Sequence, residues 1–386
     1  MNRRGVLKIA GATVVVAGGA LAWRAFDQGV FSAGSGAAYE PWKNWQADDS
    51  PRPLRLVRAA ILAANPHNSQ PWRFRVTENT IDVFADPGRN IGAIDPFLRE
   101  MTMGIGCALE NLLIAAATEG YSAEIKLQPD PGNPAHAAHI LLSPGTRIAS
   151  PLYDAIPKRH TNRGPYDTAR NVSADSLEGL AALGADLPGT RLIWFDSPEA
   201  RTKIGELIVG AAEAIVADRQ QSADSAKWFR TSWQQLQTFR DGTTLDAQSL
   251  PPFVDAAAKI LPPLSQETAD HAWLQATRER HVATAAAFGL ILVTDARDNT
   301  MRLRGGRLWQ RMHLWATTKR LAMQPLNQMS ERADRELQLG IEPRFGTALK
   351  ELVADAGWQA LMPLRIGYPT VEAKPSPRRD LKSVLI

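Results

Sequence analysis

Asn65-Pro66-His67-Asn68-Ser69-Gln70-Pro71-Trp72, residues 65–72, joins a predicted helix to a predicted strand. Leu54, Val57 and Ile61 have helical spacing before it, and residues 72–76 alternate between apolar and charged side chains after it. The Asn, Ser and Gln side chains of such a loop can match the donor and acceptor edge of a flat heterocycle. The same composition also fits a simple helix-to-strand turn with capping residues, so both interpretations stay open for the loop alone.

Two basic segments later in the chain suit a phosphate group. Arg159-His160-Thr161-Asn162-Arg163 places two guanidinium groups four residues apart, with a hydroxyl between them. Arg365-Ile366-Gly367-Tyr368-Pro369 predicts a strand that ends at a proline, and the loop beyond it carries the adjacent pair Arg378-Arg379. Taken singly, each segment is more commonly a solvated basic turn or a basic tail.

The rest of the chain repeats one outline loosely, as helix, strand and long helix. In the first half, the pattern predicts strands at 72–76, 81–85, 123–127 and 139–142 and a buried helix over 97–120. In the second half, it predicts strands at 190–195, 288–294 and 364–368 and helices over 173–183, from 197 and over 307–323. Residues 222–265 have no counterpart in the first half, so they form either an extra helical hairpin or a lid over a site.

Composition excludes several classes of protein. The chain has 386 residues, of which 44% are hydrophobic and 22% charged, as in ordinary globular proteins. Its single cysteine, Cys107, excludes an intrachain disulfide framework and a cysteine-based metal cage. The sequence shows no carboxylate near His136 and His139 and no metal-binding pattern, so no metal site is predicted. Gly104-Ile105-Gly106 lies in an apolar helix and predicts close helix packing, since no dinucleotide fingerprint surrounds it.

The N-terminus predicts an export signal. The chain carries a net charge of +4, and most of it lies in residues 1–36. The nearly neutral body gives no indication of nucleic-acid binding. Arg3-Arg4, followed by Lys8 and the apolar run Ile9–Trp23, resembles a twin-arginine signal, which implies export by the twin-arginine machinery. We therefore expect a signal over 1–36, a linker over 37–53 and a periplasmic protein, or one held at the inner membrane if the signal stays uncleaved.

Together, the three segments resemble the nitroreductase family of FMN-dependent oxidoreductases. Asn68-Ser69-Gln70-Pro71-Trp72 is similar to the family's Asn-x-Gln-Pro-Trp loop, and Arg159-His160-Thr161-Asn162-Arg163 is similar to its phosphate segment. The run from Arg365 to Pro369 and the pair Arg378-Arg379 are similar to its terminal strand and basic loop. The likeness extends from about residue 51 to the end of the chain.

The order of these motifs departs from typical members, which are shorter and form intertwined homodimers with FMN at the interface. Here the Gln-Pro-Trp loop precedes Arg159, which implies the long single-chain branch of the family: an α+β, nitroreductase-like fold in which two α/β halves, 54–158 and 159–386, form a fused pseudo-dimer. Central long helices would join the halves, and the insert 222–265 would be a helical lid. One flavin site is implied, because no second Gln-Pro-Trp loop occurs near residues 187–190. The chain would be a monomeric pseudo-dimer or a homodimer.

The resemblance also implies roles for individual residues. The phosphate would be held by Arg159, Thr161 and Arg379, together with Arg378, and Arg163 would lie at the N1/O2 edge of the ring. The Asn327 backbone would lie near N5, which carries the chemistry, so no catalytic side chain and no metal is implied. The residues implied to bind FMN are Asn65, Pro66, His67, Asn68, Gln70, Arg159, His160, Thr161, Arg163, Pro325, Leu326, Asn327, Arg378 and Arg379.

The implied activity is ping-pong transfer of two electrons from a small-molecule donor to a nitroaromatic or quinone-like acceptor. The first alternative is an exported protein that binds or sequesters flavin with little or no turnover. The second alternative is a membrane-tethered module that binds a protein partner and carries no cofactor. Bound flavin distinguishes these functions, because the oxidoreductase and the flavin-binding protein would be yellow, whereas the partner-binding module would be colourless.

Overall fold

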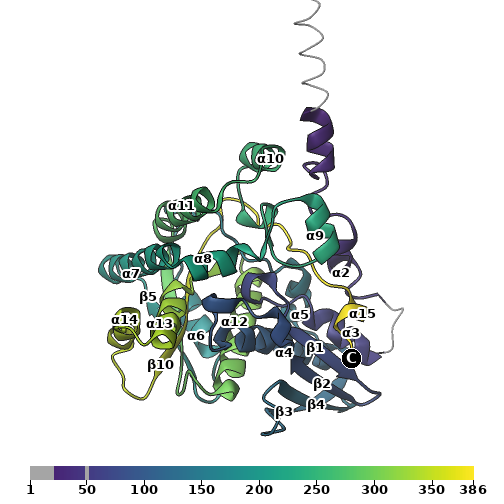
Figure 1. The fold of residues 1–386 in the computed structure, drawn as a ribbon. Helices are drawn as coiled ribbons and strands as arrows, with labels where there is room; N and C mark the ends of the chain where they lie inside the picture. The colour runs from purple at the N-terminus through teal and green to yellow at the C-terminus, as the bar shows by residue number, and fades with distance from the viewer. Residues whose placement is uncertain (1–20, 48–51) are drawn as a thin grey trace, which may run out of the picture.

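The computed structural model describes residues 21–47 and 52–386 (Figure 1). It contains two antiparallel four-stranded sheets, one in each half of the chain. The first has the order β1-β2-β4-β3, with strands Trp72–Val76, Thr80–Ala85, His136–Pro144 and Tyr121–Leu127. The second has the order β5-β8-β10-β9, with strands Thr190–Phe195, Ala287–Val293, Gln359–Gly367 and Ala322–Pro325. The predicted α+β class with two halves is confirmed.

Two long helices join the halves. α4, Arg99–Glu119, packs on the first sheet, and α12, Asn299–Thr318, packs on the second and against α4. Their backbones touch at two glycines: a Cβ on Gly106 would lie 2.2 Å from the Leu303 carbonyl oxygen, and one on Gly306 would lie 2.0 Å from that of Met103. This agrees with the close packing predicted for residues 104–106. Among the described residues, α4 alone has the length and apolar composition of a membrane span, but 78% of that stretch is buried.

The second long helix begins and ends earlier than predicted. The Asp298 side chain accepts a hydrogen bond from the Met301 amide and so caps the helix start. The helix ends before Arg320, whose φ of 56° is left-handed, and the chain then enters β9. The prediction of one helix over 307–323 is therefore wrong at both ends, because the apolar pattern continues from the helix into the strand.

Shorter helices surround these layers. In the first half α3 spans Arg52–Ala60, η2 Pro66–Asn68, η3 Pro87–Arg89 and η4 Gly92–Ile94. The crossing to the second half contains α5, Pro151–Ala155, and η5, Ile156–Lys158. The second half adds α6, Ala174–Ala182, α7, Pro198–Ala217, α13, Gln328–Leu339, and α14, Arg344–Val353. Packing of α7, α13 and α14 on the second sheet forms a separate apolar cluster around Phe288 and Phe345.

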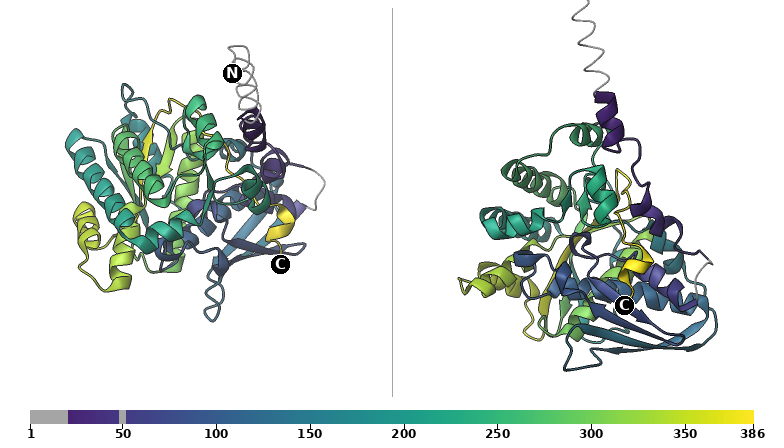
Figure 2. Two further views of the ribbon diagram at one scale, coloured as in Figure 1. Left: turned by 45° about the horizontal axis from the view of Figure 1, so that its top comes forward. Right: turned by 45° about the vertical axis from the view of Figure 1, so that its right-hand side comes forward.

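Residues 219–282 form the insert, which covers one end of the molecule (Figure 2). They contain α8, Arg219–Ala226, β6, Phe229–Arg230, α9, Trp233–Phe239, β7, Thr243–Thr244, and η6, Asp246–Gln248. They continue through α10, Pro252–Ile260, α11, Gln266–Ala276, and the π-helical turn η7, Thr277–Val282. The predicted hairpin over 222–265 is thus part of a longer series of short helices.

Both ends of the described chain pack on the body. Residues 21–27 are helical, and η1, Ala37–Tyr39, and α2, Glu40–Lys43, follow them. We predicted a linker over 37–53, but its described part, 37–47, packs on the body. Tyr39, Trp42 and Trp45 are buried in the main core. At the other end α15, Leu381–Val384, returns to the first half, where the Ile386 amide donates to the Phe74 carbonyl at 2.9 Å. Most of the predicted signal, residues 1–20, lies outside the described residues.

Candidate functional site

The loop between α3 and β1 is held in a strained turn. His67, Asn68 and Gln70 have φ values of 47°, 54° and 52°, a left-handed region that costs about 1 kcal/mol or more for each non-glycine residue. The Asn65 side chain accepts a hydrogen bond from the Gln70 amide at 2.7 Å and closes the turn. Side-chain hydrogen bonds thus hold the loop in an unfavourable backbone conformation.

Asn68 lies at the centre of the contacts around this loop. Its Nδ2 donates to the carbonyl of Gly242 at 3.1 Å and to that of Pro377 at 2.8 Å. Its Oδ1 accepts a hydrogen bond from the Arg378 guanidinium. One amide therefore joins three segments that are far apart in sequence: the first-half loop, the insert and the C-terminal loop.

Two arginines from the second half meet behind this loop. Arg159 and Arg378 are 2% and 3% exposed, and both donate to the carbonyl of Leu62, at 3.2 and 3.4 Å. The described residues supply no carboxylate ion pair to either guanidinium, and the Nε atom of each is buried without a hydrogen-bond partner. Two buried cations without a counter-anion form an electrostatically incomplete site, because a buried charge is stable only when paired.

The pKa values of these groups reflect burial and, for Arg378 and His160, the nearby positive charge as well. Burial lowers the pKa of Arg159 to about 10 and that of Arg163 to about 10. Burial and the nearby Arg159 lower the pKa of Arg378 well below its ordinary value. Burial, Arg159 and Arg378 lower the pKa of His160 to about 3, so this imidazole is neutral at physiological pH. An anion bound here would relieve the repulsion between Arg159 and Arg378.

These side chains line one narrow cavity. Its volume is about 30 Å³, near that of one water molecule, so a larger group can enter only if lining side chains move. It brings together seven of the residues predicted to bind the cofactor with four others. The lining residues are Trp42, Ala64, Asn65, Asn68, Arg159, His160, Thr161, Arg163, Thr243, Ser376 and Arg378.

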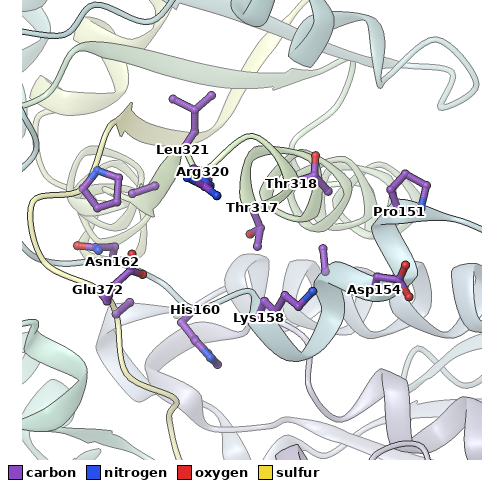
Figure 3. A pocket seen from close by; sticks show the side chains of 14 residues that line it. Pro151, Asp154, Lys158, His160, Asn162, Thr317, Thr318, Arg320, Leu321 and Glu372 are labelled. Carbon is purple, nitrogen blue, oxygen red and sulfur yellow. The ribbon is translucent and has the colours of Figure 1, made fainter.

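A second, larger cavity lies on the other side of the basic segment (Figure 3). Its volume is about 660 Å³, and Lys158 and Asn162 line it, whereas Arg159, Thr161 and Arg163 line the narrow cavity. His160 lines both cavities. The other five residues alternate between the two cavities, as the side chains of an extended backbone do. The Arg-x-Thr-x-Arg spacing therefore directs its three donors to the same side, where they face the Asn68 loop.

Some predicted residues lie outside the narrow cavity. Gln70 is fully buried beside it: its Oε1 accepts from the Arg379 amide at 2.8 Å and its Nε2 donates to the Arg240 carbonyl at 2.9 Å. The Arg379 guanidinium donates to the carbonyls of Gln70 and Ser383, so Arg378 rather than Arg379 faces the cavity. Successive side chains of this extended segment point in opposite directions, and sequence alone could not say which of the pair points inward.

The remaining predicted residues lie around the narrow cavity without lining it. Pro66 packs on α4, where a Cβ on Gly104 would lie 2.9 Å from the Pro66 ring. His67 Nε2 lies 3.0 Å from the Ser225 hydroxyl in α8. Neither Pro325, Leu326 nor Asn327 lines the narrow cavity. They form the junction of β9 and α13, where the buried Asn327 Oδ1 has no hydrogen-bond partner among the residues that the structure describes.

Comparison with known proteins gives relatives of similar length. No protein-family model matches the chain. Rv3131 of Mycobacterium tuberculosis, provisionally named an NAD(P)H nitroreductase, is 27% identical over 337 residues, which are 86% of this chain and 90% of the relative. Acg of the same organism, with the same provisional name, is 36% identical over 116 residues, 28% of this chain and 34% of the relative. The nitroreductase family is therefore supported.

The solved nitroreductases are more distant. One with bound FMN from Desulfitobacterium hafniense has a TM-score of 0.38 at 11% identity, over 61% of this chain and 98% of that chain. A nitroreductase-like protein from Bacillus cereus has a TM-score of 0.33 at 13% identity, over 62% of this chain and 95% of that chain. The nitroreductase assignment thus depends on the sequence relatives and on the residues of the cavity.

The nitroreductase motifs missed several cavity residues. Trp42 stacks edge-on against the His160 ring at 4.7 Å between centroids and lies under the Arg378 guanidinium at 4.7 Å. A tryptophan in a supposed linker was the available signal, since linkers seldom carry large apolar side chains. Nothing in the sequence marked Thr243 or Ser376, because their positions depend on long-range packing.

One correction concerns the histidines of the first sheet. His136 Nε2 and His139 Nδ1 each lie 2.8 Å from the same Asp82 oxygen, so a carboxylate does lie beside them. The sequence concealed this contact because strand pairing of β2 with β4 brings Asp82 across from His139. Within residues 21–47 and 52–386, no group of three or more such side chains is placed to hold a metal ion.

Proposed function

We propose that this protein binds FMN in the narrow cavity and acts as an oxidoreductase of the nitroreductase type. The observation that carries the proposal is the pair of buried guanidiniums, Arg159 and Arg378, which pair with no carboxylate of the described residues and face amides from the other half of the chain. A phosphate monoester is the anion that such a pair suits, because it accepts several charge-assisted hydrogen bonds.

Each donor has a proposed role toward FMN, which would enter as the lining side chains move. Arg159, Thr161 and Arg378 would bind the phosphate, and Arg163 would place a cation at the pyrimidine edge of the ring. Asn65 and Asn68 would supply amide contacts from the first half. Bound FMN would supply two-electron transfer through N5, from a small-molecule donor to a nitroaromatic or quinone-like acceptor. The chain's own residues bind, orient and shield the cofactor.

A second candidate function is favoured by the position of the insert. The Gly242 amide donates to the Asn68 carbonyl at 3.1 Å, and the Arg163 guanidinium donates to the Ala247 carbonyl at 3.1 Å. The insert is thus bonded directly to the residues that would hold FMN, and its Thr243 lines the cavity. A flavin beneath it would be shielded from large reactants, so the protein would retain FMN with little turnover.

Purified protein separates these functions. Visible absorbance of oxidised flavin, with FMN identified by mass after release, is expected for both candidates. Oxidation of NAD(P)H in the presence of menadione or a nitroaromatic is expected only for the oxidoreductase. Bound FMN without NAD(P)H oxidation would support the shielded flavoprotein, whereas colourless protein that fails to bind added FMN would overturn both.

We further propose export by the twin-arginine route and a monomeric pseudo-dimer. The Arg3-Arg4 pair with its apolar run supports export, and the two joined halves around α4 and α12 support the monomer. Fractionation of cells expressing the chain, with Arg3-Arg4→Lys-Lys as the control, tests export, since the variant should stay in the cytoplasm. Sedimentation equilibrium tests the oligomeric state, and a mass twice that of the chain would overturn the monomer.

A further inference from the structure

Helix α10 has its charged and apolar sides inverted relative to an ordinary surface helix. Asp255 and Lys259 are 7% and 9% exposed, and their charged groups lie 3.3 Å apart. Asp246 and Lys374 complete the network, with Lys259 and Lys374 each 2.8 Å from Asp246. In contrast, Phe253 on the same helix is 86% exposed. The helix therefore buries its ions and presents its apolar side outward.

More apolar side chains extend this surface. Leu261 and Leu264, just after α10, are each 62% exposed. The helix of residues 21–27 lies beside α10, where the Arg24 guanidinium bonds to the Ile260 carbonyl (Figures 1 and 2). Trp23 and Phe26 on that helix and Phe31 after it are exposed by 68%, 76% and 78%. We define the apical surface as Trp23, Phe26, Phe31, Phe253, Leu261 and Leu264.

Water does not stabilise such an arrangement. Aromatic and aliphatic groups gain free energy when they leave water, and an exposed group of them on one end of a molecule indicates a protein or membrane contact. The inverted polarity of α10 strengthens this indication, because a helix that served only to cover the body would place Phe253 inward. The apical surface therefore has an apolar partner.

The chain itself indicates which partner. The sequence before the helix of residues 21–27 is the apolar run Ile9–Ala20, preceded by Arg3, Arg4 and Lys8. An apolar run with basic residues at its far end is typical of membrane insertion, and in the sequence it directly precedes the helix that lies beside α10. We propose that the apical surface lies in the interfacial layer of a phospholipid bilayer, next to this N-terminal segment, with the insert facing the membrane.

A fluorescent probe on α10 tests this in the full-length chain. Cys107 is buried and burial raises the pKa of its thiol, so a thiol-directed, polarity-sensitive probe will label the Phe253→Cys variant at the new position. On addition of phosphatidylethanolamine–phosphatidylglycerol vesicles, we expect its emission to shift to shorter wavelength and to be quenched by lipids with spin-labelled acyl chains. A Leu261→Cys variant gives an independent reading on the same surface and should behave alike.

The matched control is Leu337→Cys on α13, an apolar residue that is 60% exposed outside the apical surface. Its probe should neither shift nor be quenched. The proposal is overturned if vesicles leave the probes at 253 and 261 unchanged, or if the probe at 337 responds equally. It is also overturned if the probes at 253 and 261 shift with protein concentration alone, which indicates a second copy, or report an apolar environment before vesicles are added, which indicates the chain's own N-terminal segment.

Discussion

The two helix-to-strand junctions of the molecule differ although the halves share their outline. In the first half, the junction between α3 and β1 carries Asn65, Asn68 and Gln70 in a strained turn and faces two buried arginines. In the second half, residues 183–189 between α6 and β5 form a short turn in which Gly189 packs on the start of α12, since a Cβ there would lie 2.6 Å from the Met301 sulfur.

That difference shows that the fold repeats while the site does not. The sheet order and the long helix recur because each half needs one apolar face covered. The amides and guanidiniums need not recur, because they contribute nothing to the apolar core. Each junction can therefore change without loss of the fold, and one of the two has become the candidate site.

The largest expected effect comes from disrupting the contact between α4 and α12, the helices that join the two halves. Gly306→Ala places a Cβ against the Met103 backbone, where neither helix can yield without moving the other. We expect destabilisation of about 3 kcal/mol or more, measured by thermal unfolding. Gly346→Ala on α14, where the nearest atom would be 3.5 Å away, is the control and should be neutral or stabilising. Equal melting temperatures for both variants would contradict the close contact of α4 and α12.

The next effect concerns the site alone. Arg159→Met should weaken FMN binding by about 10- to 100-fold, because a charge-assisted hydrogen bond contributes roughly 1.5–3 kcal/mol. Isothermal titration with FMN measures the change, and circular dichroism checks that the fold is kept. Arg191→Met, on β5 in the second half and 49% exposed, should bind FMN as the parent does. Unchanged binding by the Arg159 variant would remove it from the phosphate site.

A smaller effect separates backbone strain from side-chain bonding at the first junction. Both Asn68→Gly and Asn68→Ala lose the three side-chain hydrogen bonds of Asn68. Glycine adopts the left-handed backbone without strain, whereas alanine keeps the strain. We expect Asn68→Ala to be about 1 kcal/mol less stable than Asn68→Gly in denaturant unfolding. If the two variants unfold alike, backbone strain does not distinguish this junction from the other.

The smallest effect concerns the region where the halves meet. Burial raises the pKa of Glu331 on α13 to about 7, and burial and Glu331 raise that of Glu100 on α4. A carboxyl whose pKa is higher in the folded state contributes stability below its unfolded value, and this is lost as pH rises toward 7. Glu331→Gln should reduce that loss by on the order of 1 kcal/mol. Melting curves from pH 4.5 to 8 test this, with exposed Glu342→Gln as control; parallel curves for Glu331→Gln and the parent would contradict it.

Much of the local structure was predictable. Strands β1 and β5 have the predicted bounds, and the helix predicted over 173–183 is α6, which Ser173 caps by accepting from the Ser176 amide. Seven of the residues predicted to bind FMN line one cavity, although their role in binding stays a prediction. The cover over that cavity was only one of two open alternatives, because nothing in residues 222–265 specifies what they touch.

The sequence by itself determined many of the helices and strands and the chemistry of the donors, because periodicity and residue type act over a few neighbouring positions. Only the tertiary structure decided that Arg378 rather than Arg379 faces the cavity and that Trp42 belongs to its wall. It also decided that Gly242 is bonded to Asn68 and that α10 turns its apolar side outward. Each of these depends on how a side chain or a loop is oriented, and that orientation is set by partners that lie far away along the chain.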